Sequence, residues 1–71
     1  MASFKSKEVI SILLKLGFIE KRQTGSHKMM YHSGKNKIIP IPIHNKDIKK
    51  GLMKSIIKQA ESTEKEFLRL K

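Results

Sequence analysis

The chain of 71 residues contains no cysteine and no tryptophan, and it has only two prolines, three phenylalanines and one tyrosine. The lack of cysteine excludes disulfides, a thiolate nucleophile and the usual cysteine ligands of zinc and iron–sulfur centres. No apolar run approaches the roughly 18 residues of a membrane span, and the N-terminus has an amphipathic helical pattern rather than a signal-peptide core. These absences predict a cytoplasmic protein that does not bind membranes.

The short length limits the size of the core. A chain of 71 residues is expected to form one domain, residues 1–71, because chains divide into several domains only at much greater length. Hydrophobic residues make up 38% of the sequence, so the core is small and is built from Ile, Leu and Met more than from aromatic rings. A two-domain enzyme is therefore excluded.

Acidic residues are scarce as well. There are six Asp and Glu against sixteen Lys and Arg, which gives a formal net charge of +10. The excess is concentrated between Lys21 and Lys58, where ten basic residues accompany one acid, Asp47. This charge favours a polyanionic partner such as nucleic acid or an acidic protein. A membrane surface is disfavoured, because the middle of the chain carries regular strand and turn patterns rather than one long amphipathic helix.

Three stretches have helical patterns. Ser6 is a suitable N-cap for a helix that Gly17 ends, and a second helix is expected over 51–60. Thr63 with Glu66 three residues later forms a capping box that predicts a last, short helix. The apolar positions are Val9, Ile10, Leu13, Leu14 and Leu16 in the first pattern, Leu52, Met53, Ile56, Ile57 and Ala60 in the second, and Phe67, Leu68 and Leu70 in the third.

Between the first two helices the pattern is that of strands. Short polar turns separate them, and Pro40 and Pro42 place the third strand at an edge of the sheet, since proline cannot donate to a ladder. The expected strands are 18–23, 27–32 and 37–43. The order α-β-β-β-α plus a short C-terminal helix predicts a two-layer α+β domain with a three-stranded antiparallel sheet.

Several short motifs then follow one another in a specific order. They are Gly25-Ser26-His27, Pro42-Ile43-His44, and Gly51 at the start of a helix that runs Lys54-Ser55-Ile56-Ile57-Lys58-Gln59-Ala60. With this set the chain resembles the HicA-type mRNA interferases, the toxins of type II toxin–antitoxin pairs. The resemblance implies a fold like the double-stranded-RNA-binding domain and metal-independent mRNA cleavage that inhibits translation and growth. It also implies a HicB-type antitoxin that covers the active site.

The resemblance places the family's catalytic histidine at His27. Where the family often has a second His or an Arg, this chain has Lys28, and Met30 replaces an aromatic residue. RNA cleavage requires a group that removes the 2′-hydroxyl proton, an acid for the leaving oxygen, and cations around the phosphate. Imidazole, with an unperturbed pKa of about 6.5, suits the first two roles. The predicted phosphate-binding residues are Arg22, Gly25, Ser26, Lys28, Lys49, Lys50 and Lys54, with no metal ligand and no cofactor.

Other interpretations stay open. His27 could be an ordinary surface residue beside a hairpin turn, and the chain a non-catalytic RNA- or DNA-binding module of the same fold. Strand alternation predicts that His27 and Tyr31 share one face and His32 the other. Tyr31 is therefore a candidate for base stacking, although a lone tyrosine is more often packed. His44 either contacts substrate or caps its loop through a hydrogen bond.

Overall fold

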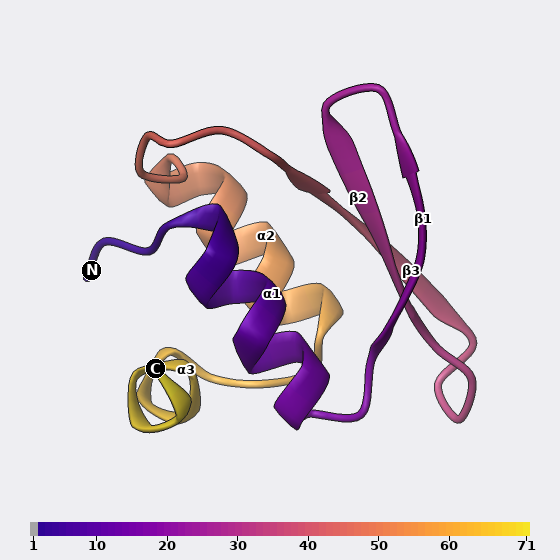
Figure 1. Cartoon of the computed structure of the whole chain (residues 1–71). Coiled ribbons are helices and arrows are strands. Elements are labelled where there is room, and N and C mark those ends of the chain that lie inside the picture. Colours follow the sequence, from indigo (N-terminus) through magenta and orange to yellow (C-terminus); the bar gives the residue numbers. More distant parts are fainter. Residues whose placement is uncertain (1) are drawn as a thin grey trace.

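Residues 2–71 are described by a computed structural model. The elements are α1 (Ser6–Lys15), β1 (Ile19–Thr24), β2 (His27–His32), β3 (Lys37–Pro42), α2 (Lys50–Gln59) and α3 (Glu64–Leu70), as Figure 1 shows. The predicted α-β-β-β-α order with a short C-terminal helix is confirmed, and so is the α+β class.

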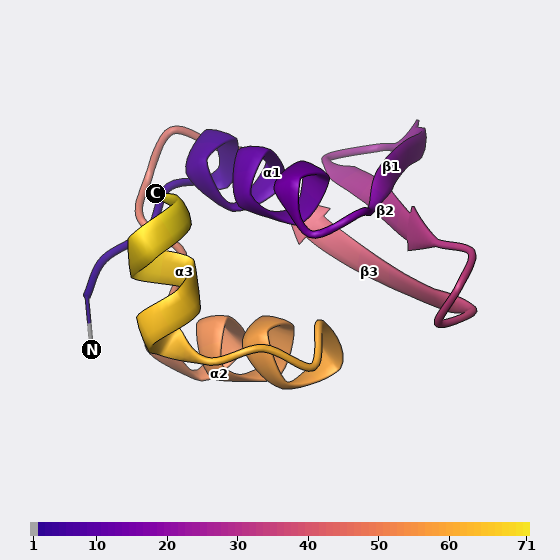
Figure 2. The same ribbon diagram turned by 90° about the horizontal axis from the view of Figure 1, so that it is seen from below.

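The molecule has two layers, a sheet and a set of helices. The strands lie in the order β1-β2-β3 and each neighbouring pair is antiparallel. Figure 2 shows the helices on one side of the sheet, where α1 packs against β1 and β3 and α2 packs against β3. Met30, Ile39 and Ile41 point into this side and are fully buried. The opposite face of the sheet is covered by no helix of the described residues, and we call it the open face.

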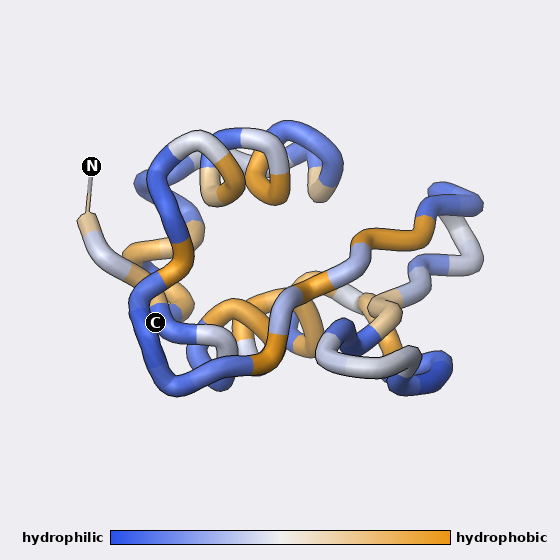
Figure 3. Tube along the Cα trace, turned by 90° about the horizontal axis from the view of Figure 1, so that it is seen from above, coloured by the Kyte–Doolittle hydropathy of each residue, from blue (hydrophilic) through white to orange (hydrophobic). Residues whose placement is uncertain are grey.

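The core lies between the sheet and the helices. Figure 3 shows that the side of α2 facing the interior of the molecule is hydrophobic and that its outer side is hydrophilic. Of the predicted apolar stripe of α2, Met53, Ile56, Ile57 and Ala60 are buried, whereas Leu52 is 40% exposed. The N-terminal segment and α3 complete the core through an edge-on contact between the rings of Phe4 and Phe67, with 6.0 Å between their centroids.

The start of α1 differs from the prediction. Lys5, not Ser6, is the N-cap residue, and the Lys5 amide donates to the Glu8 carboxylate at 2.8 Å. Ser6 is the first helical residue and is buried, and its hydroxyl donates to the carbonyl of Pro42 at the end of β3. The hydroxyl thus satisfies a strand-end acceptor rather than an amide of its own helix.

α3 begins as predicted at Thr63, whose hydroxyl accepts a hydrogen bond from the Glu66 amide at 3.1 Å. The Glu66 carboxylate accepts from the Ser62 hydroxyl, so only half of the expected capping box is present. A single cap still fixes where this short helix begins, because it satisfies one of the free amides of the first turn.

A glycine makes the turn from α1 into the sheet possible. Gly17 has φ +96°, a conformation that other residues rarely adopt. The turn directs the buried Phe18 ring against the imidazole of His32, edge-on, with 5.0 Å between the ring centroids. His32 also fills the space beside Gly17, where an added Cβ would lie 3.0 Å from the imidazole Nε2.

β3 is an edge strand, as its prolines predict. Beyond the end of β3 the amide of Ile43 still donates to the carbonyl of Ser26, at 2.6 Å. Alternate residues of an antiparallel strand turn their amides the same way, so the nitrogens of Pro40 and Pro42 point away from β2. At these two positions the outer edge of the sheet offers no N–H donor.

Candidate functional site

The β1–β2 hairpin presents His27 at its end. The turn consists of Gly25, with φ +58°, and Ser26, and both are exposed. His27 is the first residue of β2, opposite Thr24 on one side and Pro42 on the other, and its side chain is exposed. The hydrogen bond between Ile43 and Ser26 ties the turn to the end of β3. His27 therefore stands on a paired backbone although its side chain faces solvent.

A bulge in β1 decides which residues accompany His27. The register shifts between Glu20 and Arg22, so Lys21 is an extra residue without a partner on β2. An inserted residue turns the following side chains to the opposite face. Arg22 consequently pairs with Met29 and lies on the open face with His27. In an unbulged strand Arg22 would have pointed toward the helices.

The open face carries three rows of side chains that run across the strands. His27 lies in the last row, and Tyr31 lies in the first, so the predicted sharing of a face by these two residues is confirmed. The ammonium of Lys21 lies over the Tyr31 ring, 4.9 Å from its centroid. The rows are Ile19–Tyr31–Ile38, Arg22–Met29–Pro40 and Thr24–His27–Pro42.

Lys28 lies on the other face of β2. It pairs with Ile41 and Gln23, and its ammonium is 3.0 Å from the carboxylate of Glu20. Its side chain is 24% exposed. The structure thus brings Arg22, Gly25 and Ser26 together with His27, but not Lys28.

The remaining predicted cations lie in the helix layer. Lys49 is the N-cap of α2, Lys50 is its first residue and Lys54 lies one turn later, and all three are exposed. The segment 43–49 runs from the end of β3 to the start of α2 (Figure 1). The predicted site is therefore divided into two groups, one on the open face of the sheet and one at the start of α2.

The two other histidines have structural partners. The Nδ1 atom of His32 accepts the amide of Lys35 at 3.1 Å, on the side of the sheet away from His27. The predicted separation of His32 from His27 is confirmed. The Nδ1 atom of His44 accepts the amide of Lys46 at 3.2 Å, which is the predicted loop cap. Its ring is otherwise exposed.

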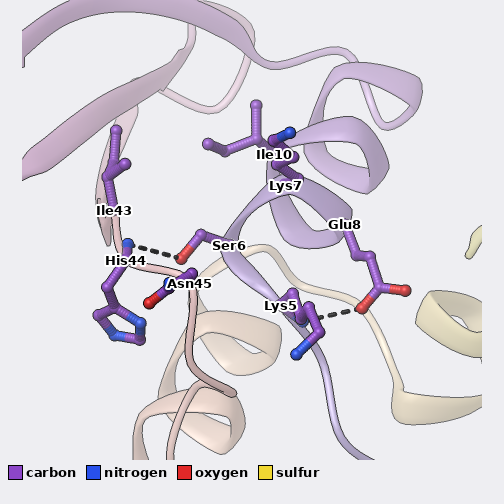
Figure 4. A pocket seen from close by; sticks show the side chains of 8 residues that line it. All are labelled: Lys5, Ser6, Lys7, Glu8, Ile10, Ile43, His44 and Asn45. Atoms are coloured by element: carbon purple, nitrogen blue, oxygen red, sulfur yellow. Dashed lines mark hydrogen bonds between the residues drawn. The ribbon is translucent and has the colours of Figure 1, made fainter.

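A pocket of about 590 Å³ separates the first turns of α1 from the segment after β3 (Figure 4). Its lining includes the apolar side chains of Ile10 and Ile43 and the polar side chains of Lys7 and His44. The hydroxyl of Ser6, 3.5 Å from the amide of His44, connects the two sides. The pocket is on the helix side of β3, and His27 is on the open face.

Two carboxylates are perturbed by lysines. The hydrogen bond from Lys5, reinforced by its charge, lowers the pKa of Asp47. Hydrogen bonds from Lys35 and Lys37 lower the pKa of Glu61, which ties the β2–β3 turn to the end of α2.

Residues 2–71 contain no group of three His, Cys, Asp or Glu that could hold a metal ion. Nor does this part of the chain contain a helix that is long and apolar enough to cross a membrane.

Comparison with known protein families gives a match over most of the chain. The model of a family described as the HicA toxin of bacterial toxin–antitoxin systems matches residues 6–61. The matched region extends from α1 through α2, so it contains the hairpin with His27, the lining of the pocket apart from Lys5, and the lysines at the start of α2. No curated protein matches the chain.

Proposed function

Because this chain belongs to the family of HicA toxins of bacterial toxin–antitoxin systems, we propose that it is a cytoplasmic endoribonuclease that cleaves mRNA and so inhibits translation and growth. The observation that supports this activity best is the placement of His27. An exposed imidazole on a paired strand end, beside a Gly-Ser turn and on one face with Arg22, is open to a nucleic-acid backbone.

His27 acts in the proposed reaction as the general base. It removes the proton of a ribose 2′-hydroxyl, the 2′-oxygen attacks the adjacent phosphorus, and the bond from phosphorus to the 5′-oxygen breaks. The 5′-oxygen takes up a proton, either from the imidazolium of His27 or from another acid. The products are a 2′,3′-cyclic phosphate and a 5′-hydroxyl, and no metal ion takes part in the step.

The other predicted residues bind the substrate. Arg22 faces the phosphate that His27 acts on and stabilises its developing charge, since charged donors aimed at such oxygens contribute most in the transition state. The amides of the Gly25–Ser26 turn approach the RNA backbone closely. Lys49, Lys50 and Lys54 bind phosphates further along the strand. Lys28 reaches RNA only by exchanging Glu20 for a phosphate, which its partial exposure allows.

The proposal is tested with His27→Ala and the control His44→Gln. His27→Ala is expected to lower the rate of RNA cleavage by about 100- to 10,000-fold, the usual contribution of general acid–base groups, and to leave RNA binding and thermal unfolding unchanged. His44→Gln should cleave normally. Assays in excess EDTA with analysis of RNA ends should yield the cyclic phosphate.

Three results would contradict the proposal. Cleavage by His27→Ala near the wild-type rate would show that His27 is not the base, and a 5′-phosphate product that forms only with Mg²⁺ would exclude the mechanism. A wild-type chain that binds nucleic acid without cleaving it would identify the alternative, a non-catalytic RNA- or DNA-binding module.

The family implies an antitoxin partner, and we propose that this partner is a HicB-type protein that covers His27. A chain with a net charge of +10 attracts acidic side chains, and its RNA-binding surface must also be kept from cellular RNA. A structure of the complex that leaves His27 open to solvent would contradict this arrangement.

A further inference from the structure

The open face of the sheet carries exposed apolar side chains that no element of the described residues covers. Ile19 is 58% exposed and Ile38 is 44% exposed, and they flank Tyr31 in one row across all three strands. Met29 and Pro40 extend the apolar surface into the next row. A contiguous patch of this kind on a small protein marks a binding surface, whereas single exposed apolar residues do not.

The side chains around this patch carry positive charge. The Lys21 ammonium lies over Tyr31, and Arg22 occupies the middle row beside Met29. Two copies that met through this face would bring two sets of Lys21 and Arg22 into one interface, and each chain has a net charge of +10. A second copy is therefore disfavoured, and an occupant with an apolar centre and an acidic rim fits.

RNA fits the patch less well than a protein does. Single strands bind through bases stacked on aromatic rings, but the row offers one ring, and the Lys21 ammonium already covers it. Its other members are aliphatic. The apolar row and the cationic rim match the usual anatomy of a protein interface, in which a desolvated centre is surrounded by polar groups.

We propose that the antitoxin docks on the row Ile19–Tyr31–Ile38, and that it covers His27 because it is bound at this position. The inference rests on the proposed function, because it assigns the docking surface of the proposed antitoxin. Tyr31 and His27 are four residues apart on β2, which corresponds to about 13 Å. An interface of roughly 800 Å² per partner is about 30 Å across. A partner centred on Tyr31 therefore extends over His27 without needing to bond to it.

This placement separates docking from catalysis. The apolar anchors lie two rows from His27 and take no part in proton transfer, so a variant can lose the antitoxin and keep its nuclease activity. Conversely, His27→Ala should lose nuclease activity and still bind the antitoxin. If the antitoxin bound through His27 and the neighbouring cations alone, no variant could lose antitoxin binding and keep nuclease activity.

The test uses Ile19→Thr with Ile38→Thr, because threonine is β-branched and retains strand propensity. The matched control is Leu52→Gln with Leu68→Gln, which removes apolar side chains of 40% and 45% exposure from the helices. Each variant is co-expressed and titrated with its HicB-type antitoxin. The face variant is expected to bind about 100-fold more weakly, as for two interface anchors, and to escape inhibition. The control and His27→Ala should bind normally.

Other results would contradict either the docking surface or the proposed function. Normal antitoxin binding by the folded face variant, or by the single variant Ile19→Thr, overturns the inference. So does a loss of RNA cleavage by the free variant, which would make the face an RNA platform, or a wild-type dimer that the substitutions dissociate. Face-dependent antitoxin binding by a wild-type chain that cleaves no RNA would refute the nuclease activity alone. A wild-type chain that binds no antitoxin refutes the docking surface and the proposed antitoxin partner together, and leaves the nuclease activity to its own test.

Discussion

At the scale of single residues, one inserted side chain determines the surroundings of His27. The Gly-Ser-His motif made it possible to predict the hairpin and the exposed position of His27 beside its turn from the sequence. The position of Arg22 beside it could not be derived in the same way, because it depends on the bulge at Lys21. A bulge is a property of the pairing between two strands, and regular alternation from either strand alone would have given the wrong face for Arg22.

Arg22 is expected to contribute to catalysis through its charge. Arg22→Gln should lower kcat/KM for RNA cleavage by about 10- to 100-fold, since a hydrogen bond to a charged group is worth roughly 1.5–3 kcal/mol. Because the side chain is exposed, the free energy of unfolding should change by less than about 0.5 kcal/mol. Lys65→Gln, an equal charge loss on α3, is the control. Equal effects of both substitutions on kcat/KM would assign Arg22 to the general electrostatic field.

At the scale of elements, local patterns predicted helices and strands to within a residue or two, and the errors have long-range causes. Ser6 is a good cap by type, but its hydroxyl binds Pro42, which lies far along the chain. Leu52 fits a helical stripe equally well inside or outside until the sheet determines the rotation of α2. Sequence periodicity holds no information about the contact with Pro42 or about the position of the sheet. Neither Ser6 nor Leu52 could therefore be placed correctly from it.

Two glycines should respond in opposite ways to substitution by alanine. Gly17→Ala is expected to destabilise the fold, because φ is +96° there and the new Cβ would lie 3.0 Å from His32 Nε2. Gly51 lies in the first turn of α2 with nothing within 4 Å of an added Cβ, so Gly51→Ala should stabilise by about 0.4–1 kcal/mol. Urea unfolding of both variants measures the difference. A stabilising Gly17→Ala would disprove the close packing of His32 against this turn.

At the scale of the whole molecule, the cations of the middle segment are distributed over both layers. Composition alone predicted that the segment from Lys21 to Lys58 carries the charge, but not that the fold would divide it. Arg22 lies on the open face, and Lys49, Lys50 and Lys54 lie in the helix layer. An RNA strand that contacts both groups must pass around the hairpin and the segment 43–49.

The salt dependence of RNA binding measures whether the second group takes part. Each lysine that neutralises a phosphate of a single strand changes the slope of log affinity against log salt by about 0.7. Lys49→Gln, Lys50→Gln and Lys54→Gln together should therefore reduce that slope by about 2, without loss of stability, since all three are exposed. The control with the same charge loss is Lys58→Gln, Lys65→Gln and Arg69→Gln. An unchanged slope would restrict the RNA path to the hairpin.

The prolines of β3 have a consequence for misassembly. A sheet grows into a fibril only if each chain can pair along both of its edges. Here the outer edge of β3 lacks donors at Pro40 and Pro42, and no strand within residues 2–71 pairs with the outer edge of β1. Two chains that meet through β1 present only proline-bearing edges to a third. Strand-to-strand aggregation of this protein therefore stops at the pair instead of propagating, which protects a small chain that exposes isoleucines on its sheet.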